Sequence, residues 1–364
     1  MQILLNVFVY PLEHGIIMKL EKIILDKIPR CYCASYAKVA GELTLLLASE
    51  AIGGACYAYS GENFSHKETV WDNSGGTMSI VEIPGKPGEI LAVQNFFPGF
   101  KAENAKIVWC RRDIKAGWLV RDYITLPYVH RFDLLESDGK AWIVACTLCG
   151  SKKDRNDWSD PGKVFVGRLT ENPDTPVNLT VLAEGLTHNH GYFRTSINGR
   201  SAGLVASDSG VMVVIPPVTS GDRWTMRTLL NTPAGDVAFF DINGDGVDEL
   251  ITIEPFHGNK VRIYELIKQE YQPVYDLPYP VDFAHALWAG KLCGEPCALI
   301  GVRKMGCELF RISHTSGEYR TEILESGCGP SNVAVAYGED CDYIISANHT
   351  KSEAAVYVAR EEKP

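Results

Sequence analysis

Short runs rich in Val, Ile, Tyr, Phe and Trp recur along the chain, and Gly, Pro, Asn and Asp separate them. Long stretches with the periodicity of an amphipathic helix are scarce. Hydrophobic runs of this length, bounded by turn residues, are typical of β-strands. The pattern therefore predicts an all-β protein.

The same arrangement of strands and turns repeats at intervals of roughly 50 residues, a period typical of repeat architectures. The clearest unit covers residues 236–266, and it reads as a strand, a tight polar turn, a strand, a loop and a third strand. A fourth strand follows most units. Seven four-stranded units predict a seven-bladed β-propeller. The seven units begin near Ser35, Gly75, His130, His190, Asp236, His285 and Asn332.

The last unit lacks a fourth strand of its own, but the N-terminal region supplies a suitable one. Residues 18–25 have the pattern of the fourth strand at 319–324. Pairing them outside residues 355–358 would close the ring and cover an exposed sheet edge. We therefore predict one propeller domain over residues 18–364, preceded by an N-terminal extension of residues 1–17.

Propeller geometry indicates which residues meet on one face of the disc. The first strand of a blade crosses the disc and the second strand returns. The start of the first strand and the end of the second strand therefore lie on the same face. Histidines are concentrated at these positions, and neutral imidazole is a common ligand of transition metals. We predict that a divalent transition metal such as Zn, Mn or Ni is bound in the central channel by His190, His257 and His285.

Other polar residues at the same positions complete the predicted site. Histidines can transfer protons, and a guanidinium can stabilise a developing enolate. The residues expected to act in catalysis are His130, His188, His349 and Arg303. The residues expected to bind substrate are Asn95, Asp208, Asp236, Glu254, Lys304 and Asn332. The alternative is a wet channel whose polar lining has no catalytic role.

The turn between the first two strands of the fifth unit has the spacing of a calcium-binding loop, with glycines at positions 244 and 246. Such spacing folds carboxylates and a carbonyl around a hard cation. We predict a structural Ca²⁺ site that faces away from the histidines; the alternative is an Asx-type turn that needs no ion. The predicted ligands are Asp241, Asn243, Asp245, the carbonyl of Val247, and Glu249.

Composition and charge narrow the range of functions. The net charge of −10 argues against binding to nucleic acid, which requires clustered Lys and Arg. No apolar run approaches the roughly 20 residues of a membrane-spanning helix. The 11 cysteines are an odd number in a chain long enough to form a core without disulfides. We therefore predict a cytoplasmic protein with buried thiols and no nucleic-acid or membrane partner.

The turn Asp-x-Asn-Gly-Asp-Gly-x-x-Glu-Leu at residues 241–250 resembles the FG-GAP/VCBS-type propeller repeats. Together with Thr-His-Asn-His-Gly at 187–191 and Glu-Pro-Phe-His-Gly at 254–258, it makes the chain similar to the N-terminal seven-bladed propeller of fungal aldos-2-ulose dehydratases. Bacterial stand-alone propellers of that type share the resemblance. It implies elimination of water from an oxidised sugar, such as an anhydrofructose or an osone.

These observations predict a metal-assisted carbohydrate lyase or dehydratase, that is, a carbon–oxygen lyase that removes water or another β-substituent from an oxidised sugar such as an anhydrofructose, osone or 3-keto sugar. The expected partner is a small sugar or an oligosaccharide, and a homo-oligomer is left open. The alternatives are a polysaccharide or oligosaccharide lyase acting on uronic-acid glycans, a glycoside hydrolase with two carboxylates, and a non-catalytic sugar- or protein-binding propeller.

Overall fold

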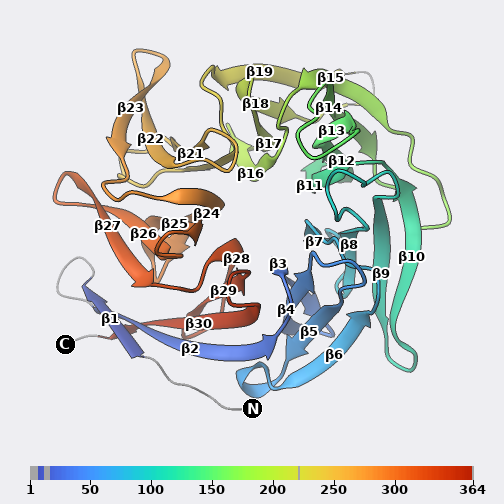
Figure 1. The fold of residues 1–364 in the computed structure, drawn as a ribbon, viewed down its shortest axis with the longest axis horizontal. Helices are drawn as coiled ribbons and strands as arrows, with labels where there is room; N and C mark the ends of the chain where they lie inside the picture. Colours follow the sequence, from blue (N-terminus) through green and yellow to red (C-terminus); the bar gives the residue numbers. More distant parts are fainter. Residues whose placement is uncertain (1–6, 12–16, 220–221, 363–364) are drawn as a thin grey trace.

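A computed structural model describes residues 7–11, 17–219 and 222–362 of the chain. Seven antiparallel β-sheets stand around a common axis in a ring (Figure 1), so the predicted seven-bladed β-propeller is confirmed. A single turn of 3₁₀ helix covers Glu62–Phe64. None of the described residues belongs to a helix long and apolar enough to cross a membrane.

The first four blades follow one another along the chain, each beginning with its innermost strand. Blade one contains β3 (Cys31–Val39), β4 (Glu42–Ser49), β5 (Cys56–Ser60) and β6 (His66–Trp71). Blade two contains β7 (Ile80–Glu82), β8 (Glu89–Gln94), β9 (Lys106–Asp113) and β10 (Gly117–Thr125). Blade three contains β11 (Val129–Ser137), β12 (Lys140–Thr147), β14 (Asp160–Arg168) and β15 (Thr180–Leu186), with the short β13 (Cys149–Ser151) beside β14. Blade four contains β16 (Gly191–Ile197), β17 (Arg200–Ser207), β18 (Gly210–Ile215) and β19 (Thr225–Leu230).

The remaining blades complete the ring and join the two ends of the chain. Blade five contains β20 (Asp236–Phe240), β21 (Glu249–Glu254), β22 (Lys260–Ile267) and β23 (Glu270–Asp276). Blade six contains β24 (Asp282–Leu292), β25 (Glu295–Lys304), β26 (Leu309–Thr315) and β27 (Glu318–Glu325). Blade seven contains β28 (Pro330–Tyr337), β29 (Asp342–Asn348), β30 (Glu353–Glu362) and, from the N-terminal region, β2 (Ile17–Lys27) with β1 (Val7–Pro11) outside it.

The hydrophobic core is divided among the seven interfaces between neighbouring blades. The described residues form seven buried clusters, six of them at an interface between two adjacent blades and one that joins blades two and three and includes Tyr32 of blade one. In β4, Leu45 and Leu47 pack against blade seven, whereas Leu46 and Ala48 pack against blade two. Successive side chains of a strand point to opposite faces of the sheet. An inner strand buried on both faces is therefore continuously hydrophobic, as the sequence runs show.

The N-terminal strand closes the ring as predicted. β2 pairs with β30 over its length, with Ile23 opposite Val356 and Ile24 opposite Ala355. β1 pairs with the other edge of β2 and extends this sheet to five strands. The closure joins the two ends of the chain by hydrogen bonds, because β2 and β30 come from opposite termini.

A buried ion cluster reinforces this closure. The Lys22 ammonium in β2 lies 2.9 Å from a Glu325 oxygen and 2.6 Å from a Glu353 oxygen, and all three side chains are buried. The Tyr357 hydroxyl also donates a hydrogen bond to Glu325 at 2.6 Å. Burial disfavours ionisation, but the contact with Lys22 lowers the pKa of both Glu325 and Glu353. The cluster therefore links blade six to the N-terminal and C-terminal strands of blade seven.

Replacing Lys22 with Met should lower the free energy of unfolding by about 3 kcal/mol at pH 7, because two buried carboxylates lose their shared cation. A carboxylate whose pKa is lower in the folded protein than in the unfolded chain stabilises the folded protein at pH values above the unfolded-state pKa. This stabilisation is lost as the pH falls through the folded-state pKa. The difference between wild type and Lys22→Met should therefore shrink on acidification. Urea unfolding at several pH values measures both effects.

Lys27→Met is the matched control, because Lys27 contacts the same Glu353 at 3.4 Å from a side chain that is 68% exposed. This variant should lose less than about 1 kcal/mol, as exposed ion pairs contribute little. An equal decrease in the free energy of unfolding in the two variants would contradict a special role for the buried Lys22.

Candidate functional site

The inner strands of four blades carry a β-bulge close to their first residue. The strand register shifts between Cys31 and Cys33, and at the corresponding point of β11, β24 and β28. A bulge adds one residue and redirects its side chain. In blades four and five the equivalent residue directly precedes the inner strand, and its N–H bonds to the second strand. The residues at this ring position, in chain order, are Tyr32, His130, His190, Gly235, His285 and Ser331.

Hydrogen bonds connect ring positions in neighbouring blades. His190 Nδ1 lies 2.9 Å from the Gly235 carbonyl oxygen, and His285 Nδ1 lies 2.7 Å from the Ser331 carbonyl oxygen. The Ser331 hydroxyl in turn lies 3.0 Å from the Tyr32 carbonyl oxygen. A carbonyl oxygen can only accept, so Nδ1 of each histidine carries the proton and Nε2 is unprotonated. This arrangement is usual for histidines that bind a metal.

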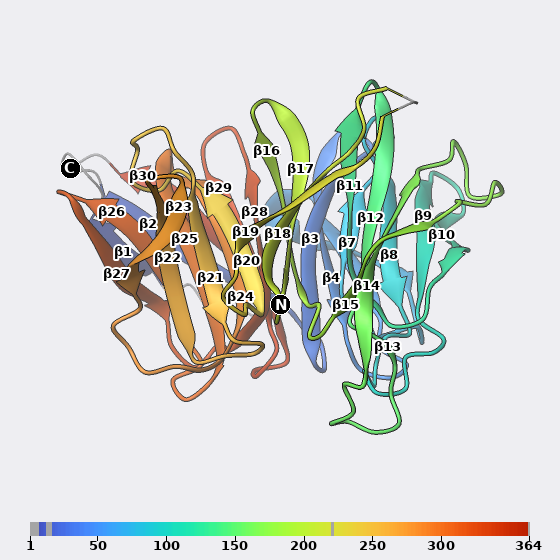
Figure 2. The ribbon, with the colours of Figure 1, turned by 90° about the horizontal axis from the view of Figure 1, so that it is seen from above.

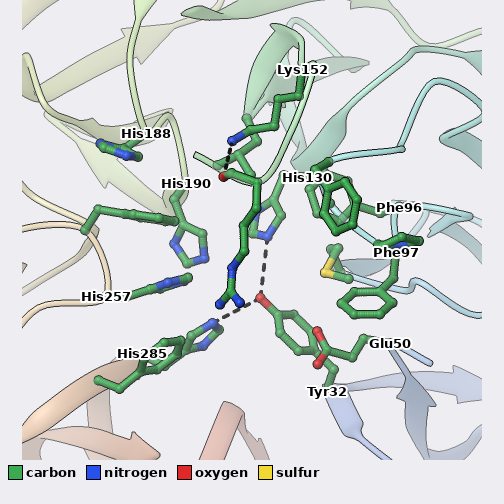
Figure 3. A pocket seen from close by; sticks show the side chains of 18 of the residues that line it. Tyr32, Glu50, Phe96, Phe97, His130, Lys152, His188, His190, His257 and His285 are labelled. Atoms are coloured by element: carbon green, nitrogen blue, oxygen red, sulfur yellow. Dashed lines mark hydrogen bonds between the residues drawn. The ribbon is translucent and has the colours of Figure 1, made fainter. Parts of the chain in front are cut away.

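The structure brings together the three histidines expected to bind metal (Figure 3). His257 comes from the loop between β21 and β22, and one ligand nitrogen from each of His190, His257 and His285 lies within 4.8 Å of the other two. The Nε2 atoms of His190 and His257 are buried without a hydrogen-bond partner. Three convergent imidazoles, two with an unpartnered nitrogen, fit the donor set of a divalent transition metal.

Burial keeps these imidazoles neutral, which is the form that binds metal. Burial lowers the pKa of His190 to about 3, and it lowers the pKa of His257 and His285 well below the usual range. The positive charge of Arg131 lowers all three values further. The nitrogens can therefore bind a cation at neutral pH without releasing a proton.

A tyrosine that the sequence interpretation missed lies beside the histidines. The Tyr32 hydroxyl is 3.1 Å from His285 Nε2 and 3.4 Å from His130 Nε2 (Figure 3). Because His285 Nδ1 holds that ring's proton, Tyr32 donates to His285 Nε2 and a neutral His130 donates to the Tyr32 oxygen. Burial raises the pKa of Tyr32 and lowers that of His130. These three groups form a chain along which a proton can move.

These residues line a cavity of about 580 Å³ whose other walls are aromatic and basic. One carboxylate, Glu50, lines it among the described residues. The aromatic side chains from outside the ring position are Phe96, Phe97, Phe100, Trp158, Phe256 and Phe283. The cationic side chains are Arg30, Lys152, Arg155 and Arg303. The cavity therefore carries excess positive charge within an acidic protein.

The single carboxylate belongs to a charged cluster at one wall of the cavity. Glu50 Oε1 lies 2.6 Å from His349 Nε2 and forms an ion pair with Arg30. Arg303 Nη2 lies 2.8 Å from His349 Nδ1. Burial opposes ionisation of Glu50, but His349, Arg30 and Arg303 lower its pKa. His349 does not line the cavity, so it contacts the two lining residues Glu50 and Arg303 from behind.

A loop after β13 covers part of the cavity and projects from one face of the disc (Figure 2). Its Trp158 ring lies 4.0 Å from the His188 ring, which stacks on Phe256 at 4.5 Å. His188 Nδ1 is 2.7 Å from an Asp208 oxygen, and the Lys152 ammonium lies 3.1 Å from the Trp158 ring centre. His188, which was expected to act in catalysis, lines the cavity, whereas Asp208, which was expected to bind substrate, does not line it and contacts His188.

All six residues expected to bind substrate lie outside the cavity wall: Asn95, Asp208, Asp236, Glu254, Lys304 and Asn332. Asp236 and Asn332 each follow a ring position by one residue. A shift of one residue along a strand turns the side chain to the other face. Phe96 and Phe97, directly after Asn95, line the cavity in its place.

Two of these six residues are held by partners within their own blade. Glu254 accepts a hydrogen bond from Tyr264 at 2.6 Å and lies 3.2 Å from Arg262. Lys304 is 59% exposed and lies 3.5 Å from Asp282. The sequence placed both correctly at the end of a second strand, but it could not show which way the side chains point.

The acidic turn lies at the far end of β20 from the ring position. Carboxylate oxygens of Asp241, Asp245 and Glu249 lie within 4.8 Å of one another. Asp241 also accepts a hydrogen bond from the Gly244 N–H at 2.7 Å, a bond that an ion-free turn makes too. The five residues expected to bind Ca²⁺ all belong to this turn: Asp241, Asn243, Asp245, Val247 and Glu249.

Comparison with known proteins supports the fold and no finer assignment. No family model and no curated protein matches the chain. Among solved structures, Saccharomyces cerevisiae Sqt1 is similar with a TM-score of 0.54 and 9% identity, covering 99% of this chain and 96% of that one. BBS1N in complex with ARL6DN is similar with a TM-score of 0.56 and 13% identity, covering 99% of this chain and 97% of that one. A putative 6-phosphogluconolactonase from Bacteroides uniformis is similar with a TM-score of 0.55 and 10% identity, covering 92% of this chain and 89% of that one. The resemblance to aldos-2-ulose dehydratases thus remains a hypothesis from sequence.

Trp158→Ala should release the covering loop, because it removes the aromatic contacts with His188 and Phe256. Trypsin should then cleave after Lys152, Lys153 or Arg155 about tenfold faster than in wild type, while the rest of the propeller stays intact. Trp224→Ala is the control, since Trp224 packs on Trp142 away from the loop. Unchanged cleavage in Trp158→Ala would show that the loop does not depend on this anchor.

Proposed function

We propose that the protein is a metal-dependent lyase or dehydratase acting on an oxidised sugar or oligosaccharide that carries negative charge. The observation that supports this most strongly is the set of His190, His257 and His285. Two of them have Nδ1 bonded to a carbonyl oxygen, and together they form part of a basic, aromatic cavity. The proposal agrees with the elimination chemistry that the sequence resemblance implies.

Elimination needs a proton acceptor, a proton donor and stabilisation of negative charge. A divalent metal bound by the three histidines would polarise a sugar carbonyl or carboxylate and make the adjacent C–H acidic. His130 is neutral and its Nε2–H donates to Tyr32, so its unpartnered Nδ1 can accept that proton. A metal on His285 Nε2 would displace the hydrogen bond from Tyr32, and the Tyr32 hydroxyl could then protonate the departing oxygen. Arg303 lines the same cavity and can stabilise the developing enolate. The C–O bond breaks and a C=C bond forms.

The charge of the cavity favours an acidic substrate. Arg30, Arg303, Lys152 and Arg155 line it against the single carboxylate of Glu50, which is already paired with Arg30. A guanidinium binds a carboxylate through two parallel hydrogen bonds. The aromatic walls offer flat apolar surfaces against which a sugar ring can pack. Uronic-acid glycans, the substrate of the alternative lyase prediction, therefore fit as well as oxidised monosaccharides.

Two other functions fit the cavity less well. A glycoside hydrolase requires two carboxylates beside the scissile bond, whereas Glu50 is the sole carboxylate lining the cavity in the described part of the chain. A non-catalytic sugar-binding propeller would have no need of three imidazoles with unprotonated nitrogens. The similar lactonase structure bears on fold alone, because its identity to this chain is 10%.

His190→Ala and His285→Ala should each lose bound transition metal and more than about 100-fold in turnover, because three ligands are the minimum of a catalytic site. Metal content is measured by elemental analysis of the purified protein. Turnover is followed by absorbance of the new C=C bond, with keto sugars and uronate oligosaccharides as substrates. The matched control is His66→Ala, at a side chain that is 65% exposed in β6. Full metal content and activity in a folded His190→Ala variant would refute the assignment.

We also propose that the turn at residues 241–249 binds Ca²⁺. Millimolar CaCl₂ should raise the midpoint of thermal unfolding, and MgCl₂ should not, because the turn offers the flexible set of several oxygens that Ca²⁺ prefers. Asp245→Asn should abolish the calcium response. An equal response to Mg²⁺, or an unchanged response in Asp245→Asn, would favour the ion-free Asx turn.

The cysteines support a reducing location, which we propose to be the cytoplasm. All 11 are free, and nine of them are buried. Burial raises the pKa of Cys146 and Cys149 to about 12, so these closely spaced thiols stay protonated and inert. Thiols of this kind need no disulfide partner for stability.

A further inference from the structure

Arg131 is a buried cation whose charge has no close partner. It lies in β11 directly after the ring residue His130, and it is 9% exposed. Its Nη1 donates a hydrogen bond to the Met78 carbonyl at 2.9 Å. No carboxylate oxygen of the described residues lies within 4.0 Å of its guanidinium nitrogens. Arginine remains charged in proteins, and an unpaired buried charge is strongly unfavourable.

Neither nearby carboxylate fully neutralises this guanidinium. Burial raises the pKa of Asp236 to about 7 although the charge of Arg131 lowers it, so this carboxyl offsets only part of the Arg131 charge at neutral pH. Asp133 is 3.3 Å from Arg194, which takes up its charge. Each of these carboxyls also accepts a hydrogen bond from the backbone N–H that follows it. The region around Arg131 therefore carries excess positive charge.

A separate small cavity lies against this arginine. Its volume is about 160 Å³, room for about five water molecules at their liquid volume. Its polar lining consists of Arg131, Asn332, Ser79, the Tyr192 hydroxyl and the Asp133 carboxylate, which is paired with Arg194. Asn332 Oδ1 accepts a hydrogen bond from the Ala34 N–H at 3.1 Å, which leaves the amide NH₂ as a donor. The cavity thus combines a buried cation with a neutral donor.

This cavity is distinct from the proposed active site. It shares no lining residue with the 580 Å³ cavity. It is also smaller than the roughly 300–1,000 Å³ of most small-molecule sites, so a sugar with its water shell does not fit. A small ion with a few waters does fit. The cavity offers the positive charge of Arg131 and neutral hydrogen-bond donors, and its carboxylate, Asp133, is already paired with Arg194. This lining favours an anion over a cation.

We propose that this cavity binds a small monovalent inorganic anion, such as chloride, against the Arg131 guanidinium and the Asn332 amide. The anion would supply the negative charge that Arg131 lacks. It would also reduce the positive potential that Arg131 exerts on the neighbouring histidines. The proposal concerns Arg131 and its cavity alone, so it stands whether or not the three histidines bind metal.

The first test is thermal unfolding of the full chain in sodium gluconate with increasing sodium chloride at constant ionic strength. The wild-type midpoint should rise with chloride and saturate. Arg131→Met should show no chloride response. Asn332→Asp, which keeps the acceptor for Ala34 and adds a negative charge, should weaken the apparent affinity about tenfold. Arg121→Met is the matched control at an exposed arginine on β10, and its response should equal that of wild type.

The second test locates the ion directly and does not depend on how well the variants fold. Crystals soaked in sodium bromide should give an anomalous diffraction peak within hydrogen-bonding distance of the Arg131 guanidinium. Bromide peaks confined to the protein surface would overturn the proposal. A chloride response that is identical in wild type and Arg131→Met would also overturn it.

Discussion

The hydrogen bonds from histidine Nδ1 atoms to carbonyl oxygens of the next blade are the interaction on which the site depends. They link His190 to Gly235 and His285 to Ser331, so each imidazole is fixed by two blades. They also determine the tautomer, which leaves Nε2 unprotonated towards its neighbours. The orientation of these two ligand nitrogens is therefore a property of the closed ring rather than of any one strand.

Closure of the ring in turn depends on the N-terminal strand. β2 completes blade seven, and the buried Lys22 connects it to Glu325 and Glu353. Ser331 at the ring position of blade seven bonds to the Tyr32 carbonyl of blade one, directly across the closure. Because His285 also bonds to Ser331, weaker pairing at the closure would disturb the orientation of His285 through these two hydrogen bonds.

The sequence predicted the fold and the convergence of the histidines, because both follow from a repeat that can be read along the chain. It missed Tyr32, because the hydrophobic pattern places the start of the first unit at Ser35. A β-bulge turns Tyr32 inward, and a bulge does not change the hydrophobic pattern of the strand. Two residues expected to bind substrate, Asp236 and Asn332, lie one position away from the ring position and outside the cavity wall. Lys152 and Trp158 lie on an insertion between strands of blade three, which no repeat predicts.

The central claim is that His190, His257 and His285 together hold one divalent transition metal. The most direct test is anomalous diffraction from crystals grown with Zn²⁺ or Mn²⁺, collected on both sides of the metal absorption edge. The account predicts a single edge-dependent peak within about 2.0–2.3 Å of all three imidazoles, with Nε2 of His190 and His285 facing it. A peak bound to one histidine or none, or no peak in the cavity at all, would contradict it.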